Sequence, residues 1–164
     1  MLGSFQLLST DAFRRAVSFF WRVFVWLLWA VWWGGLTFYA LVVVPIGTEL
    51  LGSVEQGFVT QRVTLWHNWL GVVLALALAA EAWRLRSSAW ICLSIAIAMT
   101  TVVLMVWHRH LSLAMNFVDR TVPENFYTEH AIYLWITAVE WLLGMVVAAM
   151  LTRVAFSDRL NPSR

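Results

Sequence analysis

The sequence predicts an all-α protein, an integral membrane four-helix bundle with both termini cytoplasmic. Of its 164 residues, 62% are hydrophobic and only 12% are charged, and the mean hydropathy is +0.76. The apolar runs are too long for the few charged residues to cover in water, so we expect lipid as the solvent. The runs do not alternate between apolar and polar residues, which excludes membrane β-strands and leaves helices.

Four apolar runs are long enough, or nearly so, to cross about 30 Å of hydrocarbon at about 1.5 Å per residue. We expect spans at about residues 23–44, 63–80, 89–107 and 131–151, all within a single multi-pass membrane domain covering residues 1–164. The first run is too long and starts too late for a signal peptide, and no small-residue cleavage pattern follows it. It is therefore expected to stay attached as the first span.

A surface helix is expected to lead into the first span. Residues 4–21, SFQLLSTDAFRRAVSFFW, contain side chains that cap helix N-termini, followed by apolar side chains on one helical face. The capping candidates are Ser9, Thr10 and Asp11, and the apolar face consists of Phe13, Val17 and Phe20.

Two longer segments, about residues 45–62 and 108–130, are expected to form loops on the outer side of the membrane. The first contains Gly47, Gly52 and Gly57, which we expect to break it into short amphipathic pieces lying along the membrane surface. The second mixes apolar and acidic residues, and is expected to cap the bundle.

Arginines set the expected orientation, because all eleven basic residues are arginines and they fall between the apolar runs. Basic residues collect in cytoplasmic segments, so the side with most arginines should be cytoplasmic and the protein should lie in the cell membrane, plasma or inner. Their scattering argues against nucleic acid as a partner. That side holds Arg14, Arg15, Arg22, Arg84, Arg86, Arg153, Arg159 and Arg164, whereas the other holds Arg62, Arg109 and Arg120.

Small residues at helical spacing predict where the helices approach one another closely. Such positions are the usual packing sites of membrane helices, because lipid gives helices no hydrophobic drive to associate. A stripe of Trp26, Trp29 and Trp33 on the first span is expected to face a partner chain, a bound ring system or lipid. The packing candidates are Ala30, Gly34 and Gly35 in the first span, Gly71, Ala75 and Ala79 in the second, and Gly144 in the fourth.

The motif W-x-G-G-x-x-F, present as WWGGLTF from Trp32 to Phe38 and followed by Pro45, carries a resemblance over about residues 25–150. It resembles a domain-of-unknown-function family of small four-helix membrane proteins, which includes a eukaryotic transmembrane protein named for cisplatin resistance. More remotely it is similar to the copper-resistance protein D membrane domain and to the haem-containing bacterial protoporphyrinogen oxidase. Members of these two groups commonly carry a histidine before the motif, whereas this chain has none there.

Two polar stripes run along the third and fourth spans toward the outer side. Glu140 lies within the fourth apolar run, where an ionised carboxylate would cost several kcal/mol, so we expect it to be protonated. If the stripes face each other, Thr101 or Ser94 can hydrogen-bond Glu140. Two interpretations of Glu140 follow. It either binds a proton or cation that enters through a half-channel from the outer side, or it is a neutral carboxyl group that donates an interhelical hydrogen bond. The stripes consist of Ser94, Ala98, Thr101, Met105 and His108, and of His130, Tyr133, Thr137, Glu140 and Gly144.

All four histidines fall on the predicted outer side. His108 and His110 are about 200° apart on a helix, so only one of them can face inward. A site of His67, His108 and His130, with Met105 as a soft neighbour, would suit copper or haem b. The alternative is that these imidazoles simply suit the polar membrane interface.

The chain contains no C-x-x-C, H-E-x-x-H, phosphate-binding glycine loop or nucleophile elbow, which argues against an enzyme. Our best concrete hypothesis is a metal- or haem-binding membrane protein with its site at the outer ends of the second to fourth spans. The alternatives are a small transporter or channel subunit using Glu140, and an accessory or assembly subunit of a larger membrane complex. The expected partners are the lipid bilayer and either a second copy of the chain or such a complex.

Overall fold

The computed structural model describes residues 2–116, 118–119 and 121–160, and within them the regular structure is helical. This confirms the predicted all-α class. The elements are α1 (Leu2–Phe38), a π-helical turn η1 (Tyr39–Val43), α2 (Val44–Leu51), α3 (Ser53–Leu85), α4 (Ser88–Ala114) and α5 (Phe126–Leu160).

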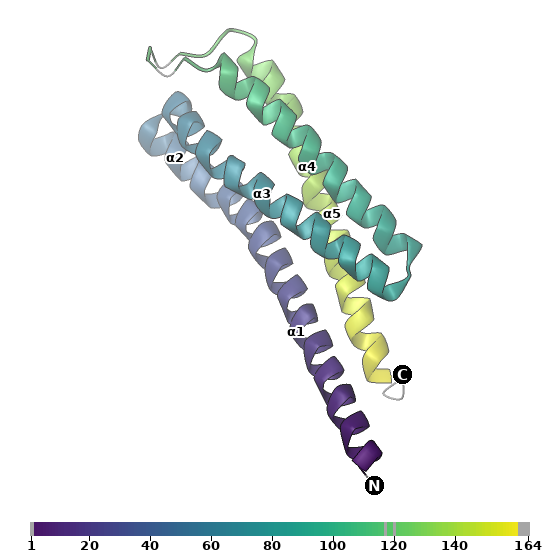
Figure 1. Cartoon of the computed structure of the whole chain (residues 1–164). Coiled ribbons are helices and arrows are strands. Elements are labelled where there is room, and N and C mark those ends of the chain that lie inside the picture. The colour runs from purple at the N-terminus through teal and green to yellow at the C-terminus, as the bar shows by residue number, and fades with distance from the viewer. Residues whose placement is uncertain (1, 117, 120, 161–164) are drawn as a thin grey trace.

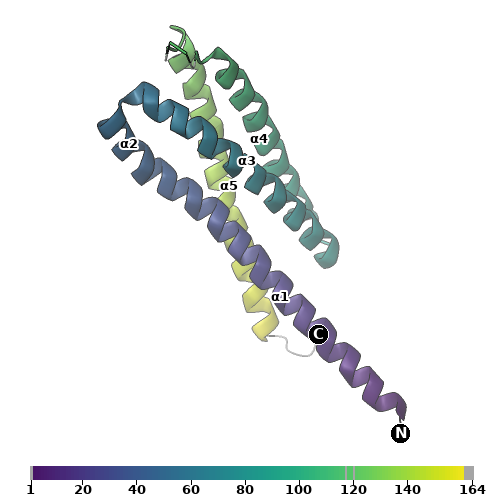
Figure 2. The same ribbon diagram turned by 60° about the vertical axis from the view of Figure 1, so that its left-hand side comes forward.

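The helices form an up-and-down bundle in which α3 lies between α1 and α4 (Figures 1 and 2). Both ends of the chain lie at the same end of the bundle, and the α3–α4 turn at Arg86 and Ser87 points the same way. We call this the terminal end. The opposite end, which we call the hairpin end, carries α2, Gly52 and the α4–α5 loop.

Four segments in the described part of the chain are long and apolar enough to cross a membrane: Ala12–Leu51, Ser53–Leu85, Ser88–Ala114 and Phe126–Phe156. Their outer faces expose large apolar side chains such as Leu76, Val106 and Trp135. In the first segment only 11% of the most apolar window is buried inside the protein, so most of that helix needs an apolar surrounding from elsewhere. The fold is that of a multi-pass membrane protein with four spanning helices.

The helices extend well beyond the predicted spans. The prediction of an outer loop at residues 45–62 is wrong. That segment consists of α2 and the first turns of α3, broken only at Gly52, whose φ of 89° suits glycine. Gly47 and Gly57 lie inside helices instead of ending them. A Cβ at Gly47 would collide with the side chain of Gln56, so this glycine lets α2 and α3 pack as a tight hairpin.

Two more boundaries differ from the expectation. The helix α1 runs through residues 9–11 without a break, so the proposed surface helix and the first span are one element. Pro45, in the first turn of α2, has no N–H to donate to the preceding turn. The chain widens locally into η1, and Val44 N–H bonds to Tyr39 O.

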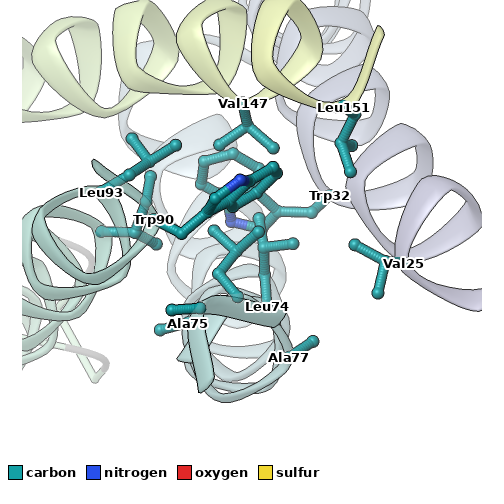
Figure 3. Close-up of a cluster of buried hydrophobic side chains, with 12 residues drawn as sticks. Val25, Trp32, Leu74, Ala75, Ala77, Trp90, Leu93, Val147 and Leu151 are labelled. Carbon is teal, nitrogen blue, oxygen red and sulfur yellow. The ribbon is translucent and has the colours of Figure 1, made fainter. Parts of the chain in front are cut away.

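The largest core cluster receives side chains from all four spanning helices (Figure 3). Trp32 of α1 is fully buried there, together with Leu74 of α3 and Val147 of α5. The Trp stripe faces the same chain, because Trp29 Nε1 donates to Gly144 O at 2.9 Å and Trp33 Nε1 donates to Trp141 O at 3.0 Å. The indoles of Trp29 and Trp33 therefore fasten α1 to α5. All three indoles are only half-buried, and contact of the stripe with a partner, a ring system or lipid stays a prediction.

The predicted packing glycines differ in what they do. A Cβ at Gly144 would collide with the ring of Trp33, so Gly144 provides space for an indole. Around Gly34 and Gly35, by contrast, no described atom of the chain lies within 4 Å of an added Cβ. Ala30 and Ala79 are exposed, so of the predicted packing residues those that pack in the described bundle are Gly71, Ala75 and Gly144.

Candidate functional site

The carboxyl group of Glu140 lies in the interior of the bundle, with the residue 1% exposed. Thr101 Oγ1 of α4 donates a hydrogen bond to Glu140 Oε1 at 2.8 Å. This confirms that the two polar stripes face each other and that Thr101 reaches Glu140. Ser94, the other predicted donor, instead bonds to the backbone oxygen of Ala75 on α3 at 2.9 Å.

Gly71 brings α3 close to this pair. A Cβ at Gly71 would lie 2.8 Å from Thr101 Oγ1 and 3.2 Å from Trp32 Nε1. Trp32, Gly71, Thr101 and Glu140 all lie near the middle of their candidate membrane spans. We call these four residues the Glu140 site, and it joins all four spanning helices at one level.

Several buried polar atoms at or near this level have no hydrogen-bond partner in the described part of the protein. They are Glu140 Oε2, Trp32 Nε1, His67 Nε2 and Asn68 Nδ2. The ring of His67 stacks on Trp32 with centroids 5.7 Å apart, which places His67 beside the Glu140 site. Buried polar groups are rarely left unsatisfied, so a set of them gathered in one place marks a candidate site for a polar species.

Polar side chains continue from the Glu140 site toward the hairpin end. Tyr133, about two helical turns from Glu140 on α5, is buried near Asn68 and Thr64 of α3. Thr64 Oγ1 lies 3.2 Å from His108 Nδ1. The ring of His130 stacks on Tyr133 with centroids 6.3 Å apart. These contacts form one polar track through α3, α4 and α5.

A cavity of about 270 Å³ opens along this track at the hairpin end. Among the described residues that line it, none is an Asp, Glu, Arg or Lys. Tyr39 OH donates to Thr60 Oγ1 at 3.0 Å on its wall, and the cavity reaches Thr137, one turn from Glu140. Its polar lining consists of Tyr39, Thr48, Ser53, Gln56, Thr60, Gln61, Thr64, Ser112, Tyr127, Tyr133, Thr137, His108 and His130.

The three histidines of the predicted metal or haem site lie in different surroundings. His108 and His130 line the cavity, whereas His67 stacks on Trp32 and does not. His110 points elsewhere and bonds to Glu129 at 2.8 Å. Within the described residues, no group of three His, Cys, Asp or Glu side chains could hold a metal ion. Metal or haem binding at His67, Met105, His108 and His130 therefore stays a prediction.

A second buried carboxyl group was missed from the sequence. Glu81 is 2% exposed near the end of α3, and Trp21 Nε1 donates to its Oε2 at 2.8 Å. Arg84 donates to both carboxylate oxygens, at 2.9 and 2.6 Å, and its Nη1 donates to Ser18 Oγ at 2.6 Å. We call these four residues the Glu81 cluster. The spacing of three residues between Glu81 and Arg84 is the only local signal for it.

No protein-family model, curated protein or solved structure matches this chain. The fold and the site are those of a multi-pass membrane protein whose helices enclose a buried carboxyl group near a cavity at the hairpin end.

Proposed function

We propose that the protein is a small transporter or channel subunit in which Glu140 takes up a proton that enters from the hairpin end. One observation carries this proposal. Glu140 is buried at mid-span, no Arg or Lys among the described residues pairs with it, and its Oε2 has no partner. An ionisable residue in such a place usually belongs to an ion or proton pathway.

The chemistry of the lining favours a proton over a metal cation. Hydroxyl, amide and imidazole groups can pass a proton through hydrogen bonds, and they predominate among the polar groups of the cavity. Calcium takes six to eight oxygen ligands, and magnesium takes six. The Glu140 site offers one carboxyl group and one hydroxyl group.

The arginine distribution supports an orientation for this pathway. Eight of the eleven arginines lie at residues 14–22, 84–86 and 153–164, that is, early in the chain, around the α3–α4 turn and late in the chain. By the positive-inside rule the terminal end is cytoplasmic, and the cavity opens to the outside of a plasma or inner membrane. Protons would then reach Glu140 from the outer side.

Proton flux into liposomes tests the proposal. The purified full chain is reconstituted with a pH-sensitive dye inside, and an outside-acid step is applied. We expect flux that falls at least tenfold in Glu140→Gln, because the amide keeps the shape but cannot release a proton. Glu124→Gln, in the exposed α4–α5 loop, is the matched control and should keep its flux. Equal flux in wild type and Glu140→Gln would sink the proposal.

One observation favours the metal or haem alternative. His108 and His130 both line the cavity and lie on two sides of Tyr133, with ring centroids 6.5 and 6.3 Å from it. Two imidazoles at one cavity suit copper or a haem iron. An absorbance spectrum of the detergent-purified protein, with metal analysis of the same sample, tests it. The absence of both a Soret band and stoichiometric metal would exclude this alternative.

A further inference from the structure

We propose that the protein binds an anionic phospholipid of the surrounding bilayer at its terminal end, in a groove between α1 and α3. The groove has a volume of about 470 Å³ and is distinct from the cavity at the hairpin end. It is lined by Phe13, Arg14, Val17, Ser18, Trp21, Ala80 and Arg84.

The walls of the groove suit an acyl chain. Val17 on α1 is 51% exposed, and Trp21 lies about one turn further toward the middle of the span. Ala80 on α3 faces them with the smallest apolar side chain, which leaves the space open. In both views the N-terminal part of α1 continues beyond the α3–α4 turn (Figures 1 and 2).

The charges at the groove suit a phosphate group. Arg84 pairs with Glu81, and Arg22 lies close enough to both to interact electrostatically with them, so two guanidinium groups and one carboxylate gather here. Arg14 on the groove wall adds a third positive charge. Arg84 is held by Glu81 and Ser18, so it has little side-chain freedom left to lose when an anion binds beside it.

The position of the groove along the helices matches the headgroup layer. Trp83, two residues from Glu81, is 87% exposed, and Arg86 lies at the α3–α4 turn. Exposed tryptophan and arginine at helix ends are typical of the membrane interface. Anionic lipid headgroups attract such basic positions, at about 1 kcal/mol per residue. A phospholipid in this groove would place its phosphate beside Arg14 and Arg84 and its chain along Trp21 and Ala80, toward the middle of the spans.

Lipid retention by the purified full chain tests the proposal. The protein in detergent is titrated with phosphatidylglycerol or with phosphatidylcholine of the same acyl chains, and bound lipid is counted by native mass spectrometry. We expect phosphatidylglycerol to be preferred. In Arg14→Gln its apparent affinity should fall about fivefold, the factor that corresponds to about 1 kcal/mol for one basic residue. Arg109→Gln, near the hairpin end, should leave the affinity unchanged.

A second variant tests the acyl-chain wall. Ala80→Leu should fill the groove and reduce retention of both lipids, whereas Ala79→Leu, an exposed neighbour that does not line the groove, should not. Thermal unfolding in the same detergent shows that each variant is folded. Equal retention of the two lipids, or unchanged retention in Ala80→Leu, would overturn the proposal. Displacement of the lipid by glycerol phosphate at equal concentration would also overturn it, because the groove would then bind only the anion.

Discussion

Two glutamates are buried in this bundle to nearly the same degree, and their surroundings are opposite. Glu81 is 2% exposed and accepts hydrogen bonds from Trp21 and from the guanidinium of Arg84. Glu140 is 1% exposed and accepts one bond from the hydroxyl of Thr101. A buried carboxylate needs a cation or several donors, and Glu81 has both. Glu140 has neither among the described residues, so it is suited to hold a proton.

The depth of each residue explains the difference. Glu81 lies in the last two turns of α3, where Arg84 can keep 31% of its side chain exposed and still reach the carboxylate. An arginine at mid-span would have no such access to water or headgroups. The Glu81 cluster therefore fastens α1 to α3 at the terminal end, whereas the Glu140 site keeps a neutral group at the centre.

The largest effect is expected from Glu81→Ala. This change leaves Arg84 and the indole of Trp21 without their acceptor, which should lower the free energy of unfolding by about 3 kcal/mol. Unfolding of the purified protein in mixed micelles by added SDS measures it. Glu49→Ala, on the exposed face of α2, is the control. A loss no larger than that of the control would show that the Glu81 cluster does not stabilise the fold.

The next largest effect is expected at the Glu140 site. Gly71→Ala places a methyl group 2.8 Å from Thr101 Oγ1, which must move and lose its bond to Glu140. We expect a loss of about 2 kcal/mol in the same assay, since overpacking a tight contact costs about 1–3 kcal/mol. Gly34→Ala has space around its Cβ within the described bundle and should be neutral or slightly stabilising. Equal results for the two alanines would contradict the close approach at Gly71.

A smaller loss is expected for Thr101→Val, which removes the donor to Glu140 and keeps the shape of the side chain. Interhelical hydrogen bonds in membranes contribute about 0.6 kcal/mol on average and up to about 1.7 kcal/mol, so we expect about 1 kcal/mol. Thr100→Val is the control, because Thr100 bonds only to backbone oxygens of its own helix. If the neighbouring variant lost as much, the bond to Glu140 would contribute nothing specific.

The smallest change in stability is expected for Glu140→Gln, below about 0.5 kcal/mol, because an amide can replace a protonated carboxyl group as both acceptor and donor. Its proton flux should nevertheless be lost. Glu81→Gln should behave in the opposite way, with a larger loss of stability and retained flux. If Glu140→Gln and Glu81→Gln each changed stability and proton flux by similar amounts, the proposed distinction between the two carboxyl groups would be wrong.

The sequence alone was sufficient for the four spans, because apolar runs of this length have no other stable solvent. It also offered Thr101 as one of two possible partners of Glu140, with Ser94 as the other, because steps of three and four residues define the two stripes. It failed at the helix ends. Residues such as Gln56, Thr60 and Arg62 lower the hydropathy of the segment without disfavouring a helix, so hydropathy underestimates the length of α3.

Contacts between residues that lie far apart in the sequence could not be predicted either. Glu81 and Arg84 were close in the sequence, yet the partner that completes the cluster, Trp21, is on another helix. Gly34 and Gly35 looked like contact positions because glycine permits close approach, but whether a neighbour approaches depends on the opposite surface. At Gly144 that surface is the indole of Trp33, which no pattern within one helix can indicate.

The length of α3 has a consequence for the mouth of the cavity. Its 33 residues correspond to about 50 Å of helix, against about 30 Å of hydrocarbon in a typical bilayer. The excess must be taken up by tilting or by protrusion into the headgroups, and the cavity residues Gln56 and Thr60 lie within the first turns of this helix. The thickness of the host membrane therefore sets how deeply the mouth is submerged, and with it the access of water.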